Sequence, residues 1–359
     1  MEIAHTPVLR KTGLSRLARG PFCAKWVSPA TNLFVIRTAI TELLGIDRPI
    51  ALAGMGGGTS PALVAAVSNA GALGILGVTG AEPDELKKRV ADIRARTEGP
   101  FGLNLILAFS TDSDIDAAIA ARPSVLSTAW PNDGQGLKTI FDRAHDAGLK
   151  VVHMVPTVTD ALKAAEAGAD VIVAQGTDGG GHIGLMGTAV IVPAVVNAVG
   201  PLPVLAAGGI ADGRGLAAML AYGASGVLMG TRFLATTESP LHEAIKQRIV
   251  ASDGTDTMVT DVGDIMLGND WPGALARVSR NRLIERWLGR TNELRQHREE
   301  VSQQTSRASK LGDVDEALIY WGQSAGLIGE IVPAGDVVAR MVREAESILR
   351  DRLPRLVSE

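Results

Sequence analysis

The stretch Ala206-Ala207-Gly208-Gly209-Ile210 is followed, after one segment of helical character, by Val227-Leu228-Met229-Gly230-Thr231-Arg232. Each stretch is a short apolar run that ends in glycine. This spacing is typical of the last two units of a (β/α)8 barrel, in which the loops after strands seven and eight commonly bind a phosphate. Glycine lets the backbone approach an anion, and the N–H groups that start the next helix point at it. The two stretches therefore predict a barrel with a phosphate cradle at Gly208, Gly209, Gly230 and Thr231.

Upstream of these stretches, short apolar runs alternate with longer amphipathic ones. This alternation predicts strands and helices in strict succession. The expected strands are 49–53, 73–76, 101–107, 124–127, 150–155, 170–174, 203–206 and 225–229. Eight β/α units in series predict the α/β class and a closed (β/α)8 TIM barrel over residues 41–251, rather than an open sheet.

The chain has 359 residues, more than the roughly 250 of a bare barrel, and the surplus falls at its two ends. Residues 1–40 are expected to form an N-terminal extension, and residues 321–359 to close the barrel domain. Residues 252–320 are expected to be a mostly helical insertion after the eighth unit, with a charged helical run over 274–310. Because it follows the eighth strand, the insertion can reach over the mouth of the barrel. It is either a lid, or a solvated appendage or homodimer contact.

The composition argues against several classes of protein. The net charge of −4 and the pI near 5.9 disfavour nucleic acid and anionic membranes as partners. Cys23 is the single cysteine, which excludes an internal disulfide and a cysteine-based metal site. The first twenty residues lack the continuous apolar core of a signal peptide, and later apolar runs are short and interrupted by glycine. We therefore expect a cytoplasmic protein.

A third glycine-rich strand end, residues 175–182, carries the candidate for proton chemistry. His182 follows three glycines in a loop at the expected barrel mouth, and imidazole titrates near neutral pH, which suits a general base. The alternative is a histidine satisfied by neighbouring backbone. Asp178 either orients His182 or caps the backbone of its own loop. His153 lies inside a strand and is expected to be structural.

Two amides lie where apolar side chains are expected. Asn104 is inside the third strand and Gln175 follows the sixth. A buried amide is costly unless it is hydrogen-bonded. We therefore expect both side chains to bond a ligand in the barrel mouth.

Several motifs, taken in order, resemble the nitronate monooxygenase (2-nitropropane dioxygenase-like) flavoproteins. They are PIALAGMGG (49–57), AVSNAG (66–71), GLNL (102–105), GGH (180–182), the two phosphate turns and GQSAGLI (322–328). The resemblance spans residues 49–328. The related FMN-dependent enoyl-acyl-carrier-protein reductases share most of this pattern.

The resemblance implies FMN, which needs a phosphate site, an apolar slot for its ring and polar groups at the ring edge. The implied catalytic base is His182, and Arg232 would add charge beside the phosphate. The implied cofactor residues are Gly54, Met55, Gly56, Asn104, Gln175, Gly180, Gly181, Gly208, Gly209, Gly230, Thr231, Gln323 and Ser324.

The chain also departs from the family pattern, which leaves the substrate open. Gly54-Met55 stands where the family usually has proline and methionine, and Asp178-Gly179 where it has glutamate and alanine. The segment 130–133, after the fourth expected strand, differs as well.

The first expectation for function is nitronate oxidation, in which an alkyl nitronate and O2 yield a carbonyl compound and nitrite. The alternative is an NAD(P)H-dependent FMN reductase that acts on an enoyl thioester of CoA or acyl-carrier protein, or on a quinone. His182 would then donate a proton, and Arg277, Arg280 or Arg282 would meet the phosphate of the carrier. A flavin-free barrel used as a scaffold or binding module is the non-enzyme alternative.

Overall fold

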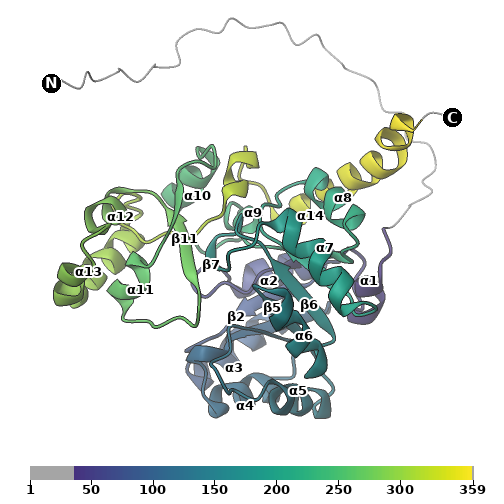
Figure 1. The fold of residues 1–359 in the computed structure, drawn as a ribbon, viewed down its shortest axis with the longest axis horizontal. Helices are drawn as coiled ribbons and strands as arrows, with labels where there is room; N and C mark the ends of the chain where they lie inside the picture. The colour runs from purple at the N-terminus through teal and green to yellow at the C-terminus, as the bar shows by residue number, and fades with distance from the viewer. Residues whose placement is uncertain (1–35, 358–359) are drawn as a thin grey trace, which may run out of the picture. The chain divides into compact units, whose positions relative to one another are not determined.

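A computed structural model of the chain describes residues 36–357. Its centre is a barrel of eight parallel strands with helices around it (Figure 1). The neighbours in the sheet follow the order β1-β9-β8-β6-β5-β4-β3-β2. The strands are β1 (Ile50–Leu52), β2 (Gly74–Gly77), β3 (Phe101–Ile106), β4 (Val125–Ala129), β5 (Lys150–Val155), β6 (Val171–Gln175), β8 (Val204–Ala207) and β9 (Gly226–Met229).

The first and last neighbours of this order also meet, which closes the barrel. The Leu52 N–H donates to the carbonyl oxygen of Leu73 at 2.8 Å, and the Leu73 N–H donates to that of Ile50 at 3.0 Å. The prediction of a closed (β/α)8 barrel is therefore confirmed.

Helices cover the outside of the barrel. They are α2 (Pro61–Asn69), α3 (Pro83–Arg94), α4 (Asp112–Ala120), α5 (Leu137–Asp146), α6 (Val158–Glu166), α7 (Thr188–Val199), α8 (Gly213–Ala221) and α14 (Ala334–Ser347). Polar side chains begin several of them: the Ser60 hydroxyl accepts from the Leu63 N–H, and the Asp212 carboxylate accepts from the Arg214 N–H. α14 packs against α8 and α2, so the C-terminal segment closes the helical ring.

The barrel strands separate two apolar layers, because successive side chains of a strand point to opposite faces. In β5, Val152 belongs to the inner cluster, whereas Val151 and Val155 belong to the cluster under the helices. Helix α1 (Ala39–Leu44) also packs into the inner cluster, and its Ile40 is fully buried. The expected boundary of the extension at residue 40 therefore falls inside a helix of the barrel domain. Residues 1–35 lie outside the described part of the chain.

His153 belongs to the outer layer of the barrel. Its ring packs on Phe141 of α5, and its Nδ1 lies 2.8 Å from the Thr128 hydroxyl. The side chain is 2% exposed. The structural role expected for His153 agrees with this position, which is remote from the barrel mouth.

Burial of His153 predicts that the protein loses stability in acid. Burial lowers the pKa of His153 from 6.5 to about 4. Below pH 6.5 the unfolded chain binds a proton that the folded chain does not, so the free energy of unfolding falls as the pH drops, by about 2 kcal/mol at pH 5. Denaturant unfolding should therefore show that the free energy of unfolding falls less between pH 7 and pH 5 for His153→Gln than for the wild type. Equal losses would contradict the assignment.

The insertion after the barrel contains strands as well as helices. Its elements are β10 (Thr257–Thr260), α11 (Val262–Leu267), β11 (Leu275–Ser279), α12 (Arg282–Trp287) and α13 (Thr291–Leu311), after α10 (Glu243–Val250). β11 pairs antiparallel with β10 and with β7 (Gly181–Ile183). The expected helical run over 274–310 is therefore wrong at its start. Ala276 and Val278 are buried on either side of the polar Arg277, and this alternation suits a strand whose partner, β7, is distant in the sequence.

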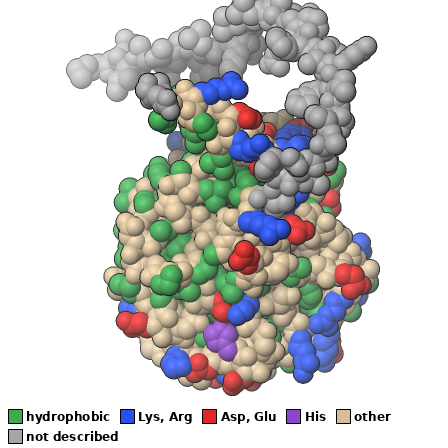
Figure 2. All heavy atoms as spheres, turned by 90° about the vertical axis from the view of Figure 1, so that its right-hand side faces the viewer, with side chains coloured by type: hydrophobic (Ala, Val, Ile, Leu, Met, Phe, Trp, Pro, Cys, Tyr) green, Lys and Arg blue, Asp and Glu red, His purple; other side chains and the backbone are tan. Residues whose placement is uncertain are grey.

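The insertion has an apolar core of its own, which includes Val262, Ile265, Val278, Leu283 and Trp287. On the face of the molecule that Figure 2 shows, acidic and basic side chains lie interspersed. Within residues 36–357, no helix is both long enough and apolar enough to cross a membrane.

Candidate functional site

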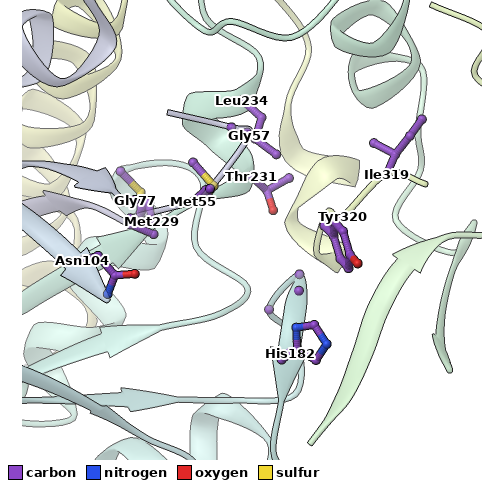
Figure 3. A pocket seen from close by; sticks show the side chains of 18 of the residues that line it. Met55, Gly57, Gly77, Asn104, His182, Met229, Thr231, Leu234, Ile319 and Tyr320 are labelled. Atoms are coloured by element: carbon purple, nitrogen blue, oxygen red, sulfur yellow. The ribbon is translucent and has the colours of Figure 1, made fainter. Parts of the chain in front are cut away.

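A cavity of about 810 Å³ opens at the carboxyl ends of the barrel strands. The loops after β1, β6, β8 and β9 line it from the barrel, and Asn269, Trp271, Ser309 and Lys310 line it from the insertion. In Figure 3, Met55 and Asn104 lie on one side of this space, and His182 and Tyr320 lie on the other. This is the end of the fold at which TIM-barrel enzymes carry their active sites.

The glycines after β8 and β9 form one wall of the cavity. Gly208 and Gly209 have φ values of +99° and +73°, which side chains rarely tolerate. Gly230 also lines the cavity. Among the described residues, no hydrogen bond uses the backbone N–H groups of these three glycines. Three free donors on adjacent barrel loops form a site suited to an anion.

The loop after β1 closely approaches β3. A Cβ on Gly54 would lie 2.3 Å from the Cβ of Asn104, so only glycine fits there. The Asn104 amide donates to the Ser127 hydroxyl at 3.0 Å. Gln175 is buried at the end of β6, and its Oε1 has no hydrogen-bond partner among the described residues. Both amides line the cavity.

The late motif joins the β9 loop to the histidine loop. The Gly322 N–H donates to the Thr231 hydroxyl at 2.9 Å, and the Gln323 N–H donates to the carbonyl oxygen of Asp178 at 3.0 Å. Ser324 is buried and lines the cavity. The Gln323 side chain is exposed and lies outside the lining. Only the backbone of Gln323 therefore supports the site in this structure.

Gly180 has a packing role beside its place in the lining. A Cβ there would lie 2.4 Å from the backbone of Trp321. Gly181, Gly56 and Met55 line the cavity as well. Of the residues expected at the cofactor, the cavity thus brings together all but Gln323.

Arg232 lies elsewhere, which corrects the expectation that it adds charge to the cradle. Its guanidinium donates to the carbonyl oxygens of Ala235 and Glu330. The side chain is buried outside the cavity lining, and burial lowers the pKa of Arg232 to about 10. Asp178 caps α7, because its carboxylate accepts from the Thr188 N–H at 3.1 Å. Of the two roles left open for Asp178, the structure therefore shows backbone capping.

His182 lies on β7 and is held by the insertion. Its Nε2 lies 2.9 Å from Oδ1 of Asp264, and the two side chains are 10% and 9% exposed. The Trp271 ring stacks on the imidazole with centroids 3.3 Å apart, and the Tyr320 ring lies at 6.0 Å. Burial, followed by the charge of Asp264, raises the pKa of Tyr320. This arrangement can hold and move a proton beside the cavity.

Trp271 also joins an aromatic cluster from the barrel. Its ring meets Phe109 edge-on at 4.9 Å and Trp130 at 6.2 Å. Trp130 is buried with φ of +51°, which is strained for a residue with a large side chain. Trp130 and Trp271 line the cavity, so a flat apolar ligand would meet aromatic walls here.

The lining contains few charges. Among the described lining residues there is no carboxylate, and Lys310 is the one permanent cation. The arginines considered for a carrier phosphate have other partners: Arg277 bonds Thr177 and Thr257, Arg280 pairs with Glu285, and Arg282 pairs with Asp315. The cavity therefore favours anionic ligands at its Lys310 end.

Comparison with known proteins identifies the family. The family model described as nitronate monooxygenase matches residues 37–129 and 112–344. The chain belongs to the nitronate monooxygenase family. It is accordingly an oxidoreductase, and proteins of this family are flavoproteins.

The curated proteins that this chain is similar to have two kinds of name. A (3aS,4S,5R,7aS)-5-hydroxy-7a-methyl-1-oxo-octahydro-1H-indene-4-carboxyl-CoA dehydrogenase of Mycobacterium tuberculosis is 38% identical, over 70% of this chain and 68% of its own length. The enzyme of that name from Rhodococcus jostii is 40% identical, over 63% of each chain. A probable nitronate monooxygenase of Staphylococcus aureus is 31% identical, over 88% of this chain and 99% of its own.

Solved structures show the same division. FabK from Thermotoga maritima superposes with a TM-score of 0.80 at 36% identity, over 89% of this chain and 99% of that one. Nitroalkane oxidase from Streptomyces ansochromogenes superposes with a TM-score of 0.74 at 27% identity, over 87% of this chain and all of that one. The family member described here thus resembles proteins with different substrates.

Sequence reasoning missed the partners of His182. Asp264 stands within the apolar run Val262-Gly263-Asp264-Ile265-Met266. A carboxylate in such a run must be paired if it is buried, so this signal was available. Nothing local identified its partner, because His182 lies 82 residues earlier in the chain.

Proposed function

We propose that this chain is an FMN-dependent oxidoreductase that reduces the double bond of an enoyl-CoA thioester with electrons from NAD(P)H. Two carboxyl-CoA dehydrogenases are 38% and 40% identical to this chain, over 70% and 63% of it, against 31% over 88% for the probable nitronate monooxygenase of Staphylococcus aureus. Their names supply the class of substrate, a carboxyl-CoA thioester.

The polar groups of the cavity fit FMN. The unpaired N–H groups of Gly208, Gly209 and Gly230 would hold the phosphate. The unpaired Oε1 of Gln175 would accept from an N–H at the ring edge. Asn104 also lines the cavity, and Met55 would line the ring. When bound, FMN supplies hydride transfer.

The extent of the cavity is the observation that carries the choice of substrate. The lining of this cavity of about 810 Å³ includes both His182 and, near the end of α13, Lys310. With FMN bound at the glycines, a small nitronate would occupy only the part beside His182, whereas a thioester with a phosphorylated carrier would also occupy the space that FMN leaves free, as far as Lys310. Trp130 and Trp271 would contact an apolar acyl group, and Lys310 would attract the carrier phosphates.

His182 would move the proton in this reaction. Reduction of an enoyl thioester adds hydride at the β carbon and a proton at the α carbon. His182 would donate that proton, and it would accept it in the reverse direction. Tyr320, which also lines the cavity, would help exclude water from this side.

Nitronate oxidation is the second candidate. The family model and the Staphylococcus aureus relative favour it, since they cover most of the chain. A lining without carboxylates in the described residues also suits an anionic nitronate. His182 would then serve as the base for a neutral nitroalkane.

Anaerobic absorbance of the FMN-loaded protein distinguishes the two candidates. We expect ethyl nitronate alone to leave the visible flavin spectrum unchanged. NADH or NADPH should bleach it, and crotonyl-CoA should then restore it. Bleaching by the nitronate without pyridine nucleotide would overturn the proposal in favour of nitronate oxidation. Bleaching by NAD(P)H that no enoyl-CoA reverses would exclude the thioester.

Lys310 provides a test of how the substrate lies in the cavity. Lys310 is exposed at the rim, so water and salt screen its interaction with a phosphate. Lys310→Ala should therefore raise KM for crotonyl-CoA by only about fivefold at low salt. KM for NAD(P)H and kcat should stay near the wild-type values. Arg307→Ala, at an exposed position of α13 outside the lining, is the matched control. Equal KM values in the wild type and both variants would place the carrier elsewhere.

A further inference from the structure

We propose that Asp264 is a positioning residue for His182. The Asp264 carboxylate fixes the proton of the imidazole on Nε2 and so leaves Nδ1 to act in the cavity. This inference rests on the proton-transfer role given to His182 in the proposed function. It assigns a catalytic purpose to the insertion, which supplies Asp264.

The contact between the two side chains is buried and direct. Nε2 of His182 and Oδ1 of Asp264 are 2.9 Å apart, with only about a tenth of each side chain exposed. A carboxylate accepts hydrogen bonds and, when ionised, has none to donate. The Nε2 atom therefore carries the proton, and the neutral imidazole keeps an unprotonated Nδ1.

The fold places Asp264 here through two independent supports. β11 pairs with β7, and in this register Ala276 lies opposite His182. Helix α11 precedes β11 and buries Val262, Ile265 and Met266 in the core of the insertion. These apolar contacts orient the helix, so that Asp264 faces His182 rather than solvent. The carboxylate would be costly at this depth without such a partner.

The other neighbours of the imidazole restrict it further. Trp271 covers one ring face in a stack tilted by 10°, and Tyr320 lies on another side. The nearby cation Arg277, next to Ala276 on β11, is bonded to Thr177 and Thr257. Among the described residues, no hydrogen bond uses Nδ1 of His182. Nδ1 is therefore the ring nitrogen available to a ligand.

This geometry predicts how Asp264 affects proton transfer. To donate a proton to the α carbon, Nδ1 must first accept one from solvent; both ring nitrogens then carry hydrogen and the ring is positive. The Asp264 carboxylate then stabilises the charge through the hydrogen bond on Nε2. Replacement of the carboxylate by an amide of the same shape removes this charge. It also allows the amide N–H to donate to Nε2, which moves the proton to Nδ1.

The test compares Asp264→Asn with Asp261→Asn in the FMN-loaded protein. Asp261 lies one turn earlier, at the exposed start of the same helix, and its side chain makes no capping bond. Two-dimensional ¹H–¹⁵N NMR of histidine-labelled protein reports the tautomer of each ring. The His182 signal is assigned by its loss in His182→Ala. We expect the Nε2–H tautomer in the wild type and in Asp261→Asn, and the Nδ1–H tautomer or a mixture in Asp264→Asn.

Kinetics supply the second readout. Asp264→Asn should lower kcat on the order of 100-fold with KM little changed, because the substitution affects proton transfer and not substrate binding. Asp264→Glu, which keeps a carboxylate, should recover part of the loss. Should Asp264→Asn fail to fold, the wild-type spectrum still decides, because an Nδ1–H tautomer of His182 in the wild type would overturn the inference.

An unchanged tautomer together with an unchanged kcat in Asp264→Asn would overturn the inference. A wild-type protein that shows the Nε2–H tautomer but turns over no enoyl-CoA would instead refute the proposed function alone. The rates would then be compared on the substrate that does reduce the flavin.

Discussion

Replacement of His182 by alanine is expected to leave flavin bound and to lower turnover by roughly 100-fold or more. His182 is the one imidazole in the cavity that pairs with a buried carboxylate, within the part of the chain that the structure describes. Its removal takes away the group that would carry the proton, whereas the glycines of the cradle are unchanged. The measurement is kcat per bound flavin, with flavin content determined from the visible absorbance after gel filtration.

The control for this prediction is His145→Ala. His145 lies on α5, pairs with Asp170 at 2.8 Å and is absent from the cavity lining. Its loss should change turnover by less than about twofold. If His182→Ala keeps wild-type turnover per flavin, His182 has no part in the chemistry, and the proton must come from Tyr320 or from water.

The second large effect is expected for Gly208→Ala, which should lose most of its FMN. The φ of Gly208 is +99°, and a Cβ there would lie 2.9 Å from the carbonyl oxygen of Gly176 and from the Thr188 hydroxyl. The left-handed backbone costs about 1–2 kcal/mol for a residue with a side chain, and the clash adds to it. Because the Gly208 N–H is one of the three unpaired donors of the cradle among the described residues, we expect Kd for FMN to rise on the order of 100-fold. Fluorescence titration of the apoprotein with FMN measures this.

Gly148→Ala separates the backbone cost from the cofactor effect. Gly148 has a φ of +80°, nothing lies within 4 Å of its added Cβ, and it is remote from the cavity lining. This variant should lower the thermal midpoint and bind FMN as the wild type does. A Gly208→Ala protein with wild-type Kd for FMN would show that the phosphate binds elsewhere.

The barrel could be predicted from the sequence because its units are local. Each strand and its following helix lie within about thirty residues, and their periodicity shows in the apolar pattern. The glycines of the cradle were visible for the same reason, since Gly208 and Gly209 directly follow β8. The two amides, Asn104 and Gln175, stood out as polar residues among apolar ones, and both line the cavity.

The insertion could be predicted only in part. Its long charged helix, α13, was expected, but β11 was assigned to that helix. β11 has only five residues, and so short a strand is difficult to recognise unless its partner is known. Its partner β7 is a three-residue strand in a glycine-rich loop, which gives no strand pattern of its own. The role of Arg232 was also misjudged. Its position after the phosphate turn suggested a cavity contact, whereas the fold turns the guanidinium toward the backbone of Ala235 and Glu330.

The sequence by itself determined the barrel, the cradle of glycines and the candidate base, because each depends on residues close together in the chain. Only the tertiary structure decided the surroundings of that base. Asp264 and Trp271 reach His182 through the pairing of β11 with β7 and the packing of α11, and both interactions join segments that are distant in the chain. Burial of a histidine and a carboxylate against each other is a property of that packing, and no local pattern encodes it.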